Sequence, residues 1–101
     1  MARLQVPQVI DLGVVNTTPK QISATELNIT SFILQAPEGN TDFIRLGNST
    51  GQLYELGPGD TLAVHGDALD NGTYAYMNMQ QWYVVAVSGT QTGNVLYLER
   101  F

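Results

Sequence analysis

The chain has 101 residues, no cysteine and a formal net charge of −5, with nine acidic side chains against four basic ones. This length is typical of a single domain with its own core, and the lack of cysteine excludes both a disulfide framework and a Cys-based zinc site. The scarcity of cations, Arg3, Lys20, Arg45 and Arg100, disfavours binding to nucleic-acid phosphates or to an anionic membrane surface.

The N-terminal stretch has no apolar segment of signal-peptide length, and no window of the chain approaches a membrane span. We therefore expect a soluble protein made in the cytoplasm. The predicted domain organisation is an N-terminal arm over residues 1–9, followed by a single β-domain over residues 10–101.

Apolar residues in the first half recur with a period of two, which is typical of β-strands. The clearest predicted strand is Asn28–Ala36, with Phe32, Leu34 and Ala36 expected on the same face as Thr30. Proline and polar turn residues separate the segments. In chain order, the predicted strands of this half are Gln8–Val15, Lys20–Thr25, Asn28–Ala36, Asp42–Leu46 and Gln52–Leu56.

The second half begins with Pro58-Gly59, which predicts a type II turn because proline fixes the first central residue and glycine accepts a positive φ at the second. The alternation lapses between His65 and Gln80, and no helix is predicted there. The later strands are expected at Asp60–Val64, at Gln81–Ser88, which is apolar enough to be central, and at Asn94–Glu99 after a hairpin loop over 89–93. About eight short strands without a helix indicate an all-β fold, an antiparallel β-sandwich or jelly roll.

No catalytic pattern is found. Serine nucleophiles need a base, and the single histidine, His65, falls at a predicted strand end with no Gly-x-Ser-x-Gly motif in the chain. The acids Asp60, Asp67 and Asp70 lack the spacing of a calcium loop, and one histidine cannot supply a two-histidine zinc site. The sequence therefore predicts a protein that is not an enzyme, with no catalytic, cofactor-binding or metal-binding residue and no cofactor.

An aromatic and methionine-rich segment, from Tyr74 to Tyr83, is the best candidate for a functional surface, because Tyr, Trp and Met are enriched in interface cores. Two alternatives stay open: Trp82 can fill the core instead, and exposed aromatic rings can stack on sugars. The candidate interface residues are Tyr74, Tyr76, Met77, Met79 and Trp82.

The turns and strands carry a resemblance to a known group of proteins. The chain shows Leu34-Gln35-Ala36, then Asn40-Thr41, then Ile44-Arg45-Leu46-Gly47, and then Leu56-Gly57-Pro58-Gly59-Asp60-Thr61-Leu62. This order, followed by an aromatic strand and a closing apolar one, resembles small β-sandwich structural proteins of tailed-bacteriophage virions. The similarity covers about two thirds of the chain, Ile29 to Leu98. Asp42 stands where the pattern usually has glycine.

The resemblance implies a virion component, a capsid decoration (cement) or head- or tail-associated protein, made in the host cytoplasm. Its expected partners are the major capsid protein or another virion protein and further copies of the same chain, with a trimer as the leading arrangement. No nucleic-acid or membrane partner is expected. The alternative function is a carbohydrate-binding or host-attachment module that stacks sugars on Trp82, Tyr74 and Tyr76.

Overall fold

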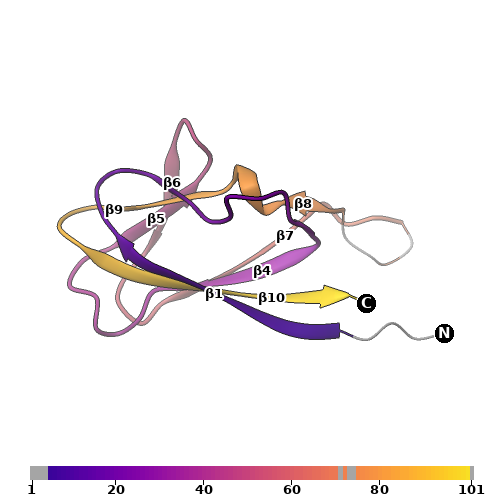
Figure 1. Ribbon diagram of the computed structural model, residues 1–101, viewed down its shortest axis with the longest axis horizontal. Helices are drawn as coiled ribbons and strands as arrows, with labels where there is room; N and C mark the ends of the chain where they lie inside the picture. The colour runs from indigo at the N-terminus through magenta and orange to yellow at the C-terminus, as the bar shows by residue number, and fades with distance from the viewer. Residues whose placement is uncertain (1–4, 71, 73–74, 101) are drawn as a thin grey trace.

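The computed structural model describes residues 5–70, 72 and 75–100, which form mostly antiparallel β-strands (Figure 1). The all-β class expected from the sequence is thus confirmed. The described part of the chain contains one 3₁₀ helix, η1 (Met79–Gln81), and ten strands: β1 (Gln5–Val15), β2 (Lys20–Gln21), β3 (Asn28–Ile29), β4 (Ser31–Gln35), β5 (Ile44–Gly47), β6 (Gln52–Leu56), β7 (Thr61–His65), β8 (Met77–Asn78), β9 (Tyr83–Ala86) and β10 (Gln91–Arg100).

The strands form several sheets. One four-stranded sheet has the order β1-β10-β4-β7, a second has the order β2-β9-β5-β6, and β3 pairs with β8 in a two-stranded ribbon. Every strand pairing is antiparallel. The last strand, β10, therefore lies inside its sheet between β1 and β4, and β6 and β7 each form an edge.

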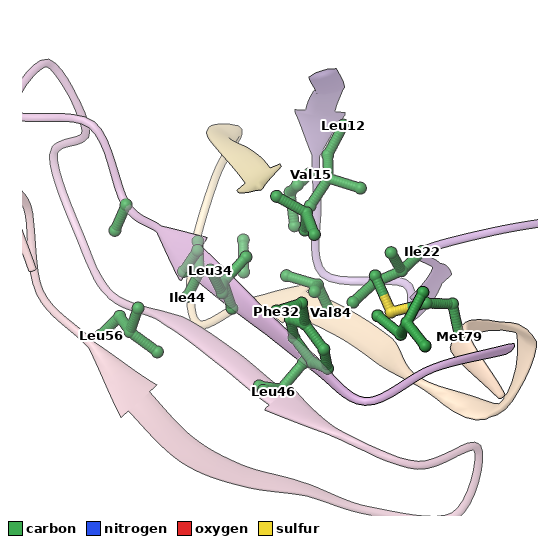
Figure 2. Packing of buried hydrophobic residues seen from close by; sticks show 14 residues of the cluster. Leu12, Val15, Ile22, Phe32, Leu34, Ile44, Leu46, Leu56, Met79 and Val84 are labelled. Atoms are coloured by element: carbon green, nitrogen blue, oxygen red, sulfur yellow. The ribbon is translucent and has the colours of Figure 1, made fainter. Parts of the chain in front are cut away.

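Both four-stranded sheets contribute side chains to one hydrophobic core (Figure 2). Phe32 and Leu34 of β4 meet Ile44 and Leu46 of β5 there, and all four are at most 2% exposed. Residues of β4 with even numbers are buried and those with odd numbers are exposed, as the period of two requires. The remaining core members are Leu12, Val15, Ile22, Ile29, Ala36, Leu56, Met79, Val84, Ala86 and Val95.

The strand predicted over 28–36 is interrupted at Thr30. Ile29 and Phe32 are both buried, although a continuous strand would turn them to opposite faces. The break occurs because Ile29 pairs with Met77 in the small ribbon, while the carbonyl of Thr30 accepts a hydrogen bond from Gly66 N–H at 3.0 Å. One predicted strand thus serves two sheets.

Two other predicted strands are shorter than expected. Lys20–Thr25 forms a strand only at Lys20–Gln21, and the hydroxyl of Ser23 then donates to the carbonyl of Thr25 at 2.8 Å, a local bond that competes with sheet pairing. β9 covers only Tyr83–Ala86 of the predicted 81–88, although it does lie centrally, between β2 and β5.

The predicted turn at Pro58-Gly59 is confirmed. Gly59 has φ +87°, and Asp60 N–H donates to the carbonyl of Gly57 at 3.0 Å, as a type II turn requires. At the N-terminus, residues 5–9 of the expected arm belong to β1 and pair with β10. The predicted loop over 89–93 is shorter, because residues 91–93 pair with β1.

Candidate functional site

Three of the candidate interface residues surround one open hollow of about 520 Å³. Tyr76, Met77 and Trp82 line it from one side, and Tyr54 of β6 lines it from the other, with Leu46 of β5 also in its wall. We call this surface, defined by Tyr54, Tyr76, Met77 and Trp82, the aromatic hollow. It lies between the β5–β6 hairpin and the segment that leads into β9.

The rings of the aromatic hollow differ in how far they are covered. Tyr54 and Tyr76 are 62% and 63% exposed, whereas Trp82 is half-buried. Trp82 packs edge-on against the core residue Phe32, with ring centroids 5.5 Å apart and an interplanar angle of 73°. Trp82 therefore combines the two interpretations left open by the sequence, because it contacts the core and also lines the hollow.

The segment that carries Met77 and Trp82 is held by hydrogen bonds to residues 21–27. The side-chain oxygen of Asn78 accepts from the backbone N–H groups of Gln80, at 3.0 Å, and Leu27, at 3.2 Å, and so caps η1. The Gln21 amide donates to the carbonyl of Gln80 at 2.7 Å. These bonds join the segment to residues 21–27.

Met79 and Tyr74 do not join the other candidates in the described hollow. Met79 is fully buried in the core, and its backbone N–H donates to the carbonyl of Leu27 at 2.8 Å. Tyr74 lies outside the described residues.

Tyr54 is the residue that sequence reasoning missed. It pairs with the buried Leu46 and so faces inward, but it lies on an edge strand and stays exposed over the hollow. The available signal was an aromatic residue at an inward position of a predicted strand. That signal indicates a surface only once β6 is known to be an edge.

A second, smaller hollow of about 350 Å³ shares Tyr54 and Trp82 with the first. Its remaining wall is β7, including Leu62, Val64 and His65. The two edge strands β6 and β7 therefore flank Trp82, and the two hollows form one largely apolar surface at this side of the molecule.

Acid–base chemistry has little support in the described residues. The Ser88 hydroxyl donates a hydrogen bond to Asp42, and with the Phe43 backbone N–H it lowers the pKa of the Asp42 carboxyl below its usual value. A carboxylate stabilised in this way is a weaker base. The carboxylate of Asp60 accepts the N–H of Gly57 at 2.9 Å within the type II turn.

Metal ligands are also scattered over the part of the chain that the structure describes, where no three His, Asp or Glu side chains gather into a possible metal site. His65 is exposed, with Nδ1 lying 2.7 Å from the carbonyl of Gly66. Among the described residues, no helix is long and apolar enough to cross a membrane.

No protein-family model matches this chain, and a search of curated proteins finds no matching sequence. The aromatic hollow and the sequence pattern of the turns are therefore the features that bear on function.

Proposed function

We propose that the chain is a non-enzymatic structural protein of a tailed-bacteriophage virion, a capsid decoration (cement) protein whose two four-stranded sheets pack as a β-sandwich. The observation that carries this proposal is the aromatic hollow, in which exposed tyrosines stand beside Met77 and a Trp82 anchored on the core. The turn pattern shared with phage structural proteins supports the choice of partner.

The composition of the aromatic hollow suits a protein partner. Aromatic and methionine side chains supply large apolar contact areas, and those at the centre of an interface contribute most of the binding energy. Tyr54 and Tyr76 are the rings with the most surface left to bury. The partner in this proposal is the major capsid protein or another virion protein.

Such a protein would stabilise the head by mass action, since it binds the assembled lattice and not its separate subunits. A cyclic homo-oligomer, a trimer first of all, would match the symmetry of capsid three-fold positions. The net charge of −5 fits a surface that faces solvent rather than packaged DNA.

The test is co-sedimentation of the purified protein with empty and filled heads of the phage that encodes it. Tyr76→Ala is expected to weaken binding about 30-fold, the size of a hot-spot loss of about 2 kcal/mol. Phe43→Ala is the matched control, because Phe43 is an exposed ring, 44% accessible, outside the hollow. Wild-type protein that co-sediments with neither empty nor filled heads would overturn the proposal.

A second candidate, a carbohydrate-binding or host-attachment module, is favoured by the amides beside the rings. Asn48, Asn78 and Gln81 line the same hollow as Tyr76 and Trp82. Amide groups next to aromatic faces can hydrogen-bond sugar hydroxyls while the rings stack on the sugar. Glycan-array binding that is lost in Tyr76→Ala and kept in Phe43→Ala would favour this function over the first.

A further inference from the structure

A row of apolar residues crosses the outer face of the β1-β10-β4-β7 sheet. Val9 pairs with Leu96, Leu96 pairs with Ile33, and Ile33 pairs with Ala63, so that each strand gives one member. Val9 is 68% exposed, Leu96 43% and Ile33 41%, and Ala63 is exposed as well. We call these four residues the apolar row.

The apolar row lies on the side of the sheet opposite the core. Its neighbours along the strands, Phe32, Leu34 and Val95, are buried and point inward. Because side chains alternate between the two faces of a strand, Ile33 and Leu96 point away from the core. Val9, Ile33 and Leu96 line neither hollow, and only Ala63, at the β7 end of the row, borders the second one.

The described side chains in the two register rows beside the apolar row are polar and carry little charge. The next register row runs through Asp11, Asn94, Gln35 and Thr61, and the row on the other side includes Ser31 and His65. Among the described side chains of these rows, Asp11 carries the only carboxylate, and no Lys or Arg is present. Few of the nine acids in the chain therefore oppose a contact made here.

We infer that the apolar row is the contact between copies of this chain. Copies that each carry a net charge of −5 repel one another, so they can approach closely only where carboxylates are sparse, and this face meets that condition. A neutral apolar row does not need a charged surface as its partner. The same row on a second copy is also neutral and apolar, so it can serve as that partner.

The geometry of the row suits rotational symmetry. Three strand-to-strand steps give it a length of about 14 Å. If the row lies along a rotation axis, every copy presents the same residues to the axis, as a closed ring requires. In the trimer proposed above, three such rows would meet on that axis.

The size of the sheet predicts that this contact is weak in isolation. Strands of 11, 10, 5 and 5 residues give a face of about 500 Å² at ordinary strand spacings. A standard interface buries about 800 Å² on each partner. We therefore expect association that rises with protein concentration.

The first test is sedimentation velocity of the purified full chain over a wide concentration range, without phage heads. The wild type is expected to increase in mean mass with concentration, whereas Ile33→Asp stays monomeric. Val87→Asp is the matched control, since it adds the same charge at an exposed valine, 39% accessible, outside the row. Circular dichroism and thermal melts establish that each variant is folded.

A second test covers the case in which Ile33→Asp does not fold. Because the chain has no cysteine, Ile33→Cys provides a single thiol. A short bismaleimide is expected to cross-link Ile33→Cys into dimers and to leave Val87→Cys monomeric. A wild type that stays monomeric at every concentration, or equal cross-linking of both variants, overturns the inference.

These outcomes separate the inference from the proposed function. If the protein self-associates through the row but does not bind phage heads, only the capsid proposal is contradicted. Loss of head binding in Ile33→Asp while its self-association matches the wild type would instead make the row a surface for the capsid, and the inference would be wrong.

Discussion

The side-chain amide of Asn40 pairs with the backbone of Thr92 as a neighbouring strand would. Its nitrogen donates to the Thr92 carbonyl at 2.9 Å, and its oxygen accepts the Thr92 backbone N–H at 2.8 Å. Asn40 is 8% exposed. The nearby side chain of Gln91, 4% exposed, accepts the N–H of Thr41 at 2.8 Å and holds the same loop. Two buried amides therefore join the 40–42 loop to the start of β10.

Asn40→Ala is expected to lower the free energy of unfolding by about 1–3 kcal/mol, because it removes two hydrogen bonds to the part-buried backbone of Thr92. Urea denaturation followed by Trp82 fluorescence measures the change. Asn94→Ala, on the outer face of the same strand, should remain within about 0.5 kcal/mol of the wild type. Equal effects of the two substitutions would contradict the role given to Asn40.

Gly59→Ala should destabilise the protein by about 1–2 kcal/mol, since the φ of +87° at Gly59 is unfavourable for any residue with a Cβ. The neighbouring turn offers a control in Gly39→Ala. A Cβ at Gly39 would meet nothing within 4 Å, and Gly39 does not have a positive φ. Thermal melts of both variants should therefore show a lower Tm only for Gly59→Ala.

Met79→Ala and Met77→Ala should separate core from surface. Removal of the fully buried Met79 side chain is expected to cost about 2–5 kcal/mol of stability, as for other large-to-small core changes. Met77 is half-buried and lines the aromatic hollow, so Met77→Ala should cost less than half as much. In the head co-sedimentation assay, Met77→Ala is expected to weaken binding at a temperature where both variants are folded. An unchanged affinity of Met77→Ala would remove Met77 from the proposed interface.

Asp42 should make stability depend on pH in acid. The Ser88 hydroxyl, then the Phe43 N–H and the nearby Arg45 lower the pKa of Asp42 in the folded state. The folded protein thus holds this proton less tightly than the unfolded chain, so the stabilisation is complete above the ordinary aspartate pKa of about 3.9 and is lost as the pH falls through the lower, folded-state pKa.

Ser88→Ala removes the main cause of this shift, so the Asp42 pKa measured by NMR titration should rise. Its stability deficit relative to the wild type should be present at neutral pH and shrink in strong acid, where Asp42 is protonated in both proteins. Thr90→Ala in the same loop serves as the control, with no expected change in the Asp42 titration. An Asp42 pKa that is the same in Ser88→Ala and the wild type would refute this assignment.

Local patterns in the sequence predicted the elements that depend on neighbouring residues. The alternation around Ile44 and Leu46 gave the buried face of β5, and Pro58-Gly59 gave the type II turn. What failed depends on partners far along the chain. Thr30 lies at a strand break where its carbonyl accepts a bond from Gly66, and the buried Met79 bonds to Leu27. Periodicity contains no information about such pairings.

The residues of the candidate site also divide into those that local sequence predicted and those that only strand pairing reveals. The richness of the 74–83 segment in aromatic and methionine residues pointed to Tyr76, Met77 and Trp82, which the fold brings to one hollow. Tyr54 joins them from a strand more than 20 positions earlier in the sequence, and only the antiparallel pairing of β5 with β6 and β9 places it there. The apolar row could not be predicted from the sequence either, because its four members come from four separate strands.

The central position of β10 has a consequence for how the chain folds. Residues 5 and 100 pair, so the β1–β10 ladder joins positions separated by nearly the whole sequence (Figure 1). During synthesis β4 and then β7 leave the ribosome before β10, the strand that separates β4 from β1. Until then β4 has an unpaired edge, and closing the long loop between β1 and β10 is slow because of its entropy cost. The nascent chain is therefore most prone to aggregate just before β10 inserts.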